Sequence, residues 1–181
     1  MAECYARIRA AADPMVAWEV WRAERDRVRR SDSTDRRRGR PSTFAYDPSY
    51  RCLASLELAS PTEEVAALPV RLHRLGTLHF ELVGSEQELE LYWLDQYGGG
   101  FFLPFHDATN GTTTSARGRH LLDHSIGADL GTAGRQFVLD FNFAYHPQLG
   151  DGMVAPRWPD GSNVIRRPVE AGERLVDRPG R

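Results

Sequence analysis

Apolar and polar residues alternate with a period of two along much of the chain, which is typical of β-strands with one buried face. Two of these runs lie close together in the sequence. Their apolar positions are Leu78, Phe80 and Leu82 in the first run and Leu89, Leu91 and Trp93 in the second. Gly84-Ser85-Glu86 separates the runs, and glycine beside polar residues is typical of a tight turn. We therefore predict an antiparallel hairpin.

Other short runs that are bounded by turn-forming residues predict further strands. They span residues 51–58, 101–105, 119–122, 136–143 and 163–169. Many short strands with one clear helix signal predict a mainly β fold, an antiparallel barrel or sandwich with one N-terminal α-helix packed on it. A length of 181 residues suffices for a single domain over residues 1–181, with its β domain at about 44–175.

Near the N-terminus the periodicity changes to that of a helix, which we predict at about residues 14–30. Asp13-Pro14 combines an N-cap residue with a proline suited to the first helical turn, and no glycine or further proline follows in this range. The core-facing stripe is predicted at Val20, Trp21 and Val28. Trp18 lies next to this stripe, so we interpret both tryptophans as core packing rather than as a stacking platform.

The segment at residues 31–42 is polar and of mixed charge, and Gly39 and Pro41 interrupt it. We predict a mobile loop there. Its arginines accompany acidic residues, so a solvated loop is the main interpretation. The alternative is that the part from Arg36 to Arg40 closes over a pocket and offers an arginine to an anionic ligand.

The amino-acid composition of the chain excludes several classes of function. The net charge of −2 and the pI near 6.3 give no electrostatic reason to bind nucleic acid or an anionic membrane. All 23 residues counted as Lys or Arg are arginines, which excludes a catalytic lysine. No segment is apolar enough for a signal peptide or a membrane span, so we expect a cytoplasmic protein. Cys4 and Cys52 form neither a metal pattern nor a disulfide pattern and are predicted to be free thiols.

The most unusual polar residues lie within the predicted strand at 136–143. One face of this strand carries Phe137, Leu139, Phe141 and Phe143. The opposite face carries Asp140 and Asn142, and both residue types are poor strand formers that need a specific reason there. We predict that these two side chains face an enclosed polar pocket rather than bulk water.

A set of motifs in a fixed order resembles a known family. The motifs are Trp21-Arg22-x-Glu24-Arg25-Asp26, Pro104-Phe105-x-Asp107-Ala108-Thr109-x-Gly111, Thr114, Gly118-Arg119, Leu139-Asp140-Phe141-Asn142-x-Ala144-Tyr145-x-Pro147, Asn163 and Ala171-Gly172-Glu173. Their order and spacing are similar to those of the domain of unknown function 1684 family. The resemblance covers most of the chain and implies a bacterial family without an established general activity, whose polar motifs look like a shared site.

Several positions depart from that family's pattern and indicate a divergent member. Thr113-Thr114-Ser115 stands where the family has Glu-Thr-Tyr, Gly118-Arg119-His120 where it has Gly-Arg-Tyr, and Tyr145-His146-Pro147 where it has Tyr-Asn-Pro. Two common cysteines fall on Leu149 and Ala155. The gain of His120 and His146 favours a specialised, pathway-specific role.

The candidate catalytic residues are Asp140, His146 and Asp107. A histidine titrates near neutral pH, and a neighbouring carboxylate can orient its ring, so this set suits general acid and base chemistry. The alternatives are structural: Asp107 caps the turn that follows it, and Asp140 holds a loop or Arg119 in place. Both alternatives stay open on the sequence alone.

The candidate substrate-binding residues are Arg119, Asn142, His120, Tyr145 and Phe105. Arg119 either forms a buried structural pair with an acid or clamps a substrate carboxylate. Since His120 follows Arg119 in a predicted strand, the two point to opposite faces, and only one can line the pocket directly.

We predict neither a metal nor a cofactor. His120 and His124 have the spacing of one helical turn, but they lie between strand signals and no third ligand is established. The glycine-rich strings at 98–100 and 130–134 are interpreted as turns, because the strand-to-helix context of a phosphate loop is missing.

We expect a cofactor-independent enzyme of the isomerase, cyclase, lyase or hydrolase type that acts on a small molecule through an acid/base pocket. The first alternative is a noncatalytic small-molecule-binding protein that uses the same pocket. The second is a polar cluster that only holds loops together. The expected partner is a small-molecule ligand or substrate, and the sequence leaves open whether the chain forms a homodimer.

Overall fold

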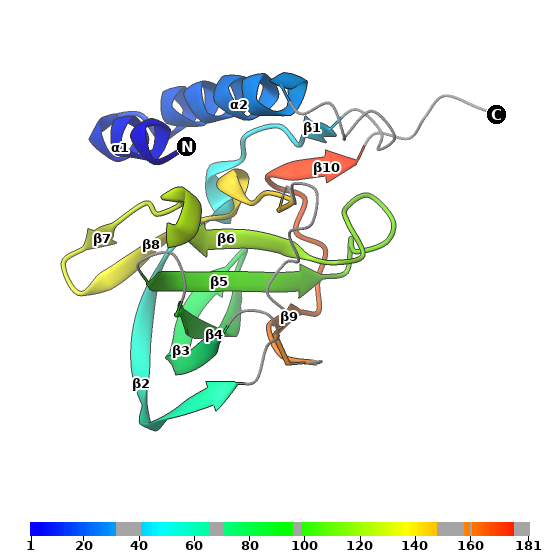
Figure 1. The fold of residues 1–181 in the computed structure, drawn as a ribbon. Coiled ribbons are helices and arrows are strands. Elements are labelled where there is room, and N and C mark those ends of the chain that lie inside the picture. The colour runs from blue at the N-terminus through cyan, green and yellow to red at the C-terminus, as the bar shows by residue number, and fades with distance from the viewer. Residues whose placement is uncertain (32–40, 66–70, 96–98, 148–157, 160, 176–181) are drawn as a thin grey trace.

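The computed structural model describes the chain except residues 32–40, 66–70, 96–98, 148–157, 160 and 176–181. Two helices, α1 (Ala2–Ala10) and α2 (Pro14–Ser31), lie side by side in one layer above the strands (Figure 1). The helix predicted at 14–30 is confirmed. Helix α1 was not predicted, because its sequence AECYARIRA shows only a weak segregation of apolar and polar positions.

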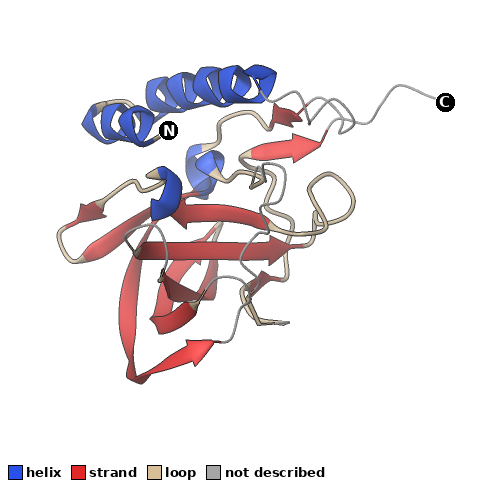
Figure 2. Ribbon diagram, in the orientation of Figure 1, coloured by secondary structure: helices blue, strands red, loops and turns tan. Residues whose placement is uncertain are grey.

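The fold is mainly β, as predicted (Figure 2). Its main sheet is curled and antiparallel along the order β6-β5-β4-β3-β2-β8-β7. These strands are β2 (Arg51–Val65), β3 (Leu72–Leu82), β4 (Ser85–Leu94), β5 (Gly100–Asp107), β6 (Arg119–Asp123), β7 (Thr132–Ala133) and β8 (Gln136–Asp140). The short β9 (Val164–Ile165) pairs in parallel with β5, and β1 (Pro41–Thr43) pairs with β10 (Glu173–Leu175) in a separate ribbon. The strand predicted at 163–169 is therefore reduced to two residues.

The predicted hairpin is confirmed as β3 and β4, which pair from Leu72↔Leu94 to Leu82↔Ser85. Its turn lies earlier than predicted, because Ser85 and Glu86 are already paired in β4. Val83 and Gly84 form its turn, with φ angles of 48° and 71°. Positive φ at both central positions is the geometry that matches the twist of paired strands. Glycine adopts it freely, whereas a β-branched valine in this region is strained.

The strand predicted at 136–143 is wrong in its second half. Strand β8 ends at Asp140, and Phe141–Phe143 form the short 3-10 helix η4. The Asp140 carboxylate accepts a hydrogen bond from the backbone N–H of Asn142, so it caps η4 instead of facing across a sheet. Because the chain turns there, Phe141 enters the core within the sheet and Phe143 enters the core beneath the helices.

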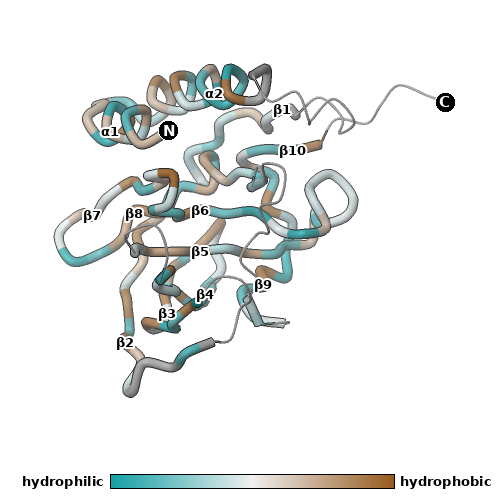
Figure 3. Tube along the Cα trace, in the orientation of Figure 1, coloured by the Kyte–Doolittle hydropathy of each residue, from teal (hydrophilic) through white to brown (hydrophobic). Residues whose placement is uncertain are grey.

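The apolar side chains gather in two main cores. One fills the curled sheet with residues such as Leu78, Leu91 and Phe105. The other lies between the helices and η4 and contains both Trp18 and Trp21, which confirms their interpretation as core packing. The mixed hydrophobic and hydrophilic positions along α2 are visible in Figure 3. A smaller group contains Phe102 on β5.

None of the described helices is long and apolar enough to cross a membrane. The two cysteines are unpaired, as predicted. The loop predicted to be mobile at residues 31–42 lies outside the described residues from 32 to 40, which includes Arg36 to Arg40. Its first residue ends α2 and its last two belong to β1, so the prediction is wrong at both ends.

Candidate functional site

Asp140 and Asn142 are both fully buried, but they contact a loop and not the other candidate residues. One Asp140 oxygen accepts from the N–H and the Nδ2 of Asn142 at 3.0 and 2.9 Å. The other faces the Arg51 Nη1 and the Tyr46 hydroxyl at 3.3 and 3.4 Å. The Asn142 amide bonds both backbone groups of Asp47. These contacts are those of the alternative in which Asp140 holds a loop.

Burial raises the pKa of Asp140, although hydrogen bonds from Asn142 and the charge of Arg51 oppose the shift. The nearby Cys52 thiol has a pKa raised to about 12, first by burial and then by the Asp140 charge. Cys52 therefore stays protonated at neutral pH, which disfavours it as a nucleophile.

Asp107 and Arg119 form a fully buried ion pair with 3.3 Å between the Asp107 Oδ1 and the Arg119 Nη2. Asp107 also accepts from the Thr109 hydroxyl at 2.9 Å and from the Val169 N–H at 2.6 Å. The Arg119 guanidinium donates in turn to the backbone carbonyls of Val169, Ala171 and Glu173. The pair thus ties β5 and β6 to the C-terminal segment, and Arg119 lies over the ring of Phe105 in the core.

His146 lies in a second network, which includes a residue that the sequence did not single out as a site residue. Its Nε2 accepts the N–H of Ser115 at 3.0 Å, and its Nδ1 is 3.6 Å from the buried Glu173 carboxylate. Glu173 also binds Arg25 of α2 at 2.7 Å. An Nε2 that accepts a backbone N–H carries no proton, so this imidazole is held as the Nδ1–H tautomer and its basic nitrogen is occupied.

His120 is held in a different way. Its backbone forms a two-bond antiparallel bridge with Tyr145. Its Nδ1 is 3.3 Å from Asp123 Oδ2, and the same oxygen accepts the Tyr145 hydroxyl at 3.0 Å. The second Asp123 oxygen accepts the N–H and the hydroxyl of Ser125. Asp123 therefore orients the imidazole through a carboxylate that is itself fixed on both oxygens.

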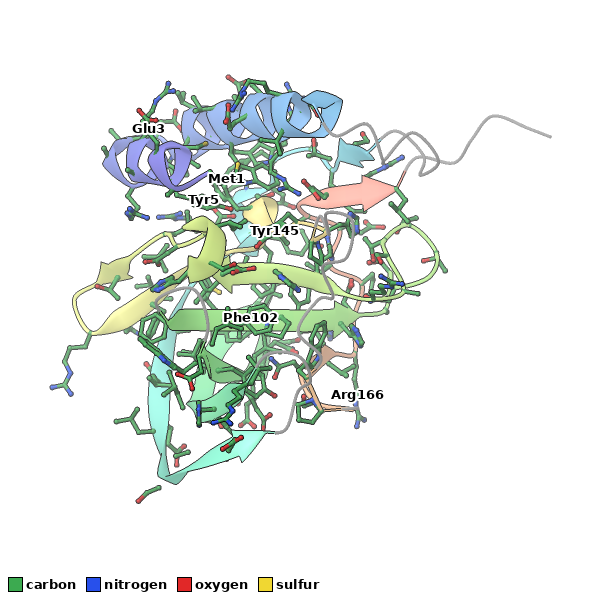
Figure 4. All side chains as sticks on the ribbon, viewed as in Figure 1. Met1, Glu3, Tyr5, Phe102, Tyr145 and Arg166 are labelled. Atoms are coloured by element: carbon green, nitrogen blue, oxygen red, sulfur yellow. The ribbon has the colours of Figure 1, made fainter. Side chains whose placement is uncertain are left out.

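The other ring nitrogen of His120, Nε2, is buried and has no hydrogen-bond partner within the part of the chain that the structure describes. Three aromatic rings surround the imidazole. Phe102 meets it edge-on with 4.7 Å between centroids, Tyr145 lies at 5.7 Å and Trp158 at 6.1 Å. Phe102 lies along β5 and Tyr145 on the helix side of β6 (Figure 4). Trp158 is half-buried and is the most exposed of the three rings.

The contacts of Asp123 fix the imidazole and leave its Nε2 open. Burial pushes the pKa of Asp123 up, but hydrogen bonds from His120, Ser125 and Tyr145 outweigh it and lower the pKa. An ionised Asp123 accepts the Nδ1–H of His120, which leaves Nε2 as the proton acceptor. Burial raises the pKa of Tyr145 well above its usual value, so its hydroxyl stays a donor. The arrangement suits general base chemistry at Nε2.

No group of three or more possible metal-binding side chains occurs among the described residues. His124, which the sequence suggested as a partner for His120, faces Asp129 at 3.3 Å instead. His120 and Arg119 point to opposite sides of β6, as predicted, since Arg119 packs on Phe105 and His120 on Phe102.

The eight residues in the candidate sets thus fall into separate networks of contacts. The structure pairs Asp107 with Arg119, places His120 beside Tyr145, and gives Asp140 and Asn142 a loop of their own. Sequence reasoning missed Asp123, Glu173 and Trp158. Asp123 carried one usable signal, because an acid three residues after His120 at the end of a predicted strand can turn back toward it. Glu173 was part of the family motif but was not weighed as a site residue.

The comparisons with known proteins agree with this fold. The solution NMR structure of an uncharacterized protein from Haloarcula marismortui is similar, with a TM-score of 0.57 and 29% sequence identity, over 85% of this chain and 90% of that one. No curated protein sequence matches. The family model described as "Protein of unknown function (DUF1684)" matches residues 40–174, which is most of the chain and includes His120, Asp123 and Tyr145. The chain therefore belongs to the DUF1684 family, as its motifs had indicated.

Proposed function

We propose that the protein is an enzyme that transforms a small molecule by proton transfer at His120. The observation that carries the proposal is the contrast between the two nitrogens of its buried imidazole. Nδ1 faces the fixed carboxylate of Asp123, and Nε2 has no partner among the described residues. An unsatisfied buried polar atom is costly, and such atoms are concentrated where a ligand completes the hydrogen bonding.

In this mechanism the substrate presents an acidic O–H or C–H group to His120 Nε2, which removes the proton and returns it to the product. Asp123 keeps Nδ1 protonated and stabilises the imidazolium that forms. Phe102 and Trp158 supply apolar walls that exclude water and strengthen the charge interaction. No redox step is required, so the reaction class is that of an isomerase, cyclase, lyase or hydrolase.

The residues of the other networks act as positioning residues in this proposal. Arg119 precedes His120 in β6 and anchors that strand to the C-terminal segment through three carbonyls and Asp107. Asp140 and His146 hold neighbouring loops. A direct catalytic role for Asp107, Asp140 or His146 stays a prediction. It is not part of this proposal, because the polar side-chain atoms of these residues already face other groups of the protein.

The test begins with a thermal-shift screen of small metabolites, followed by product analysis for each compound that raises Tm. His120→Gln should lower turnover of an identified substrate by roughly 10²-fold to 10⁴-fold, the usual range for general acid–base catalysis, while the folded protein still binds the compound. His124→Gln is the matched control, since His124 lies four residues away and pairs with a different carboxylate.

Asp123→Asn tests whether the orientation of the His120 imidazole is needed for proton transfer. The amide cannot fix the imidazole in the same tautomer, so turnover should fall although His120 is still present. Unchanged turnover in the His120→Gln variant would contradict the catalytic proposal. A compound that binds at His120 without any conversion would support the alternative of a noncatalytic binding protein.

A further inference from the structure

A cavity of about 140 Å³ lies where the β3–β4 turn meets the segment that follows β9. Its lining residues are Tyr50, Leu82, Val83, Gln87, Ile165, Arg167, Pro168 and Val169. None of them belongs to the His120, Asp123 and Tyr145 group, so the cavity is a feature separate from the proposed catalytic site. Five of its eight lining residues are apolar.

Hydrogen bonds fix the backbone of Val169, which lines the cavity. Its N–H donates to Asp107 at 2.6 Å and its carbonyl accepts from Arg119 at 2.9 Å. The ion pair between Asp107 and Arg119 is fully buried. A backbone fixed on both sides by a buried pair cannot collapse easily into the adjoining space, so this wall keeps the cavity open.

The strained valine of the hairpin turn also lines the cavity. Val83 has φ of 48° and is 51% exposed, so its isopropyl group gains little burial within the chain. Asparagine or glycine would be favoured at this turn position. Backbone strain in a residue that lines a cavity is typical of ligand sites, and here it places an apolar side chain at the cavity wall.

Arg167 is the single charged residue among those that line the cavity. Its side chain is exposed, and no ion pair or hydrogen bond of its guanidinium occurs within the described part of the chain. A guanidinium at the edge of an apolar cavity matches a carboxylate, which it can bind with two parallel hydrogen bonds. The Tyr50 hydroxyl already accepts the N–H of Glu170 at 3.3 Å and keeps its own hydrogen for an acceptor.

We infer that this cavity binds a small carboxylate whose apolar body is about the size of one six-membered ring. An apolar cavity of roughly 150 Å³ is known to hold a benzene ring, which sets the size of the body. The carboxylate lies against Arg167 and the ring against Val83, Ile165 and Val169. This site goes beyond the proposed proton transfer and does not depend on it.

Benzoate is the probe that tests the inference, with neutral benzamide as its isosteric control. Titration of the ¹⁵N-labelled full-length protein should give saturable shifts of the Val83, Ile165 and Val169 amides. Benzamide should bind at least 10-fold more weakly, because it lacks the charge that Arg167 recognises. Isovalerate, a branched carboxylate of smaller volume, should bind at the same amides.

Arg167→Gln should weaken benzoate binding about 10-fold or more. Arg166→Gln is the matched control, because Arg166 is adjacent in sequence, lies at the edge of the molecule near β9 (Figure 4) and does not line the cavity. Both side chains are exposed, so neither change should disturb folding.

Two results would overturn the inference. One is the absence of saturable shifts at these amides with both carboxylates up to about 10 mM, a concentration that detects even very weak binding. The other is an equal effect of the two arginine substitutions. His120→Gln should leave benzoate binding unchanged, so a failure of this inference and a failure of the proposed catalytic function are distinguishable.

Discussion

The two faces of β6 carry buried nitrogen–carboxylate pairs of equal length, and the pairs differ in how the rest of each group is bound. Arg119 and Asp107 on one face, and His120 and Asp123 on the other, each have 3.3 Å between nitrogen and oxygen. Arg119 binds three backbone carbonyls besides its carboxylate partner and leaves its Nε without a partner among the described residues, whereas His120 leaves one of its two ring nitrogens, Nε2, without one. Burial alone therefore does not identify a reactive group. The difference lies in the share of each group's polar atoms that the protein binds and in whether the open atom can accept a proton, which an imidazole nitrogen can and a guanidinium N–H cannot.

The largest effect is expected for the Arg119–Asp107 pair. Arg119→Met leaves the Asp107 carboxylate buried without its counter-charge and frees three carbonyls from their donor, so it should lower the free energy of unfolding by about 3–5 kcal/mol. Urea unfolding measures this. The control is Arg51→Met at the half-exposed Arg51–Asp140 pair, where solvent screening limits the loss to about 1 kcal/mol. Similar losses in the two variants would contradict the assignment of Arg119 as the main clamp.

His120→Gln should give the opposite profile. It removes one hydrogen bond and some ring packing, so the loss in unfolding free energy should be only about 1–2 kcal/mol, while turnover of an identified substrate is lost. The comparison of stability and turnover for this variant with those for Arg119→Met sharpens the contrast between the two faces. A loss in unfolding free energy as large as that of Arg119→Met would show that the main role of His120 is structural.

The acids Asp123 and Asp140 should change stability with pH in opposite directions. The lowered pKa of Asp123 means that its contribution is present above its unfolded value of about 3.9 and is lost as the pH falls through the folded pKa. The raised pKa of Asp140 means that its contribution is present below about 3.9 and is lost as the pH rises through the folded pKa.

Chemical unfolding of Asp123→Asn and Asp140→Asn between pH 3 and pH 7 measures the contribution of each carboxylate to the free energy of unfolding. The first variant should lose less stability than the wild type as the pH falls below about 4. The second should lose less than the wild type as the pH rises above about 4. Parallel curves for the two variants would show that the two carboxylates do not differ in their coupling to folding.

The smallest effect is expected at the hairpin turn. Val83→Asn relieves a β-branched residue at φ of 48° and creates the favoured Asn-Gly turn, so it should raise the free energy of unfolding by about 1 kcal/mol. It also removes an apolar wall of the cavity, so benzoate binding should weaken in the same variant. A calorimetric melt and a benzoate titration measure both terms, and a gain in stability with unchanged binding would place the ligand elsewhere.

Local patterns predicted the elements of the fold more reliably than they predicted the site. The hairpin of β3 and β4 and the helix α2 follow from periodicity and turn or cap residues, which act over a few neighbouring positions. The pattern of Phe137, Leu139, Phe141 and Phe143 misled in its second half. Four alternating phenylalanine and leucine residues fit one strand face, but the capping bond of Asp140 turns the chain so that the last of them reaches a different core.

The sequence by itself determined that the protein is mainly β with an amphipathic N-terminal helix and belongs among proteins with these polar motifs, because periodicity and motif spacing are local properties. The tertiary structure decided which polar residues meet. Asp123 reaches His120 within β6, where the register with β5 shifts, Glu173 meets Arg25 across 148 positions, and Val169 closes on Asp107 across 62. The hydrogen bonding of each group depends on such contacts, so no spacing along the chain could distinguish Arg119, which binds one carboxylate and three carbonyls, from His120, which leaves a ring nitrogen open.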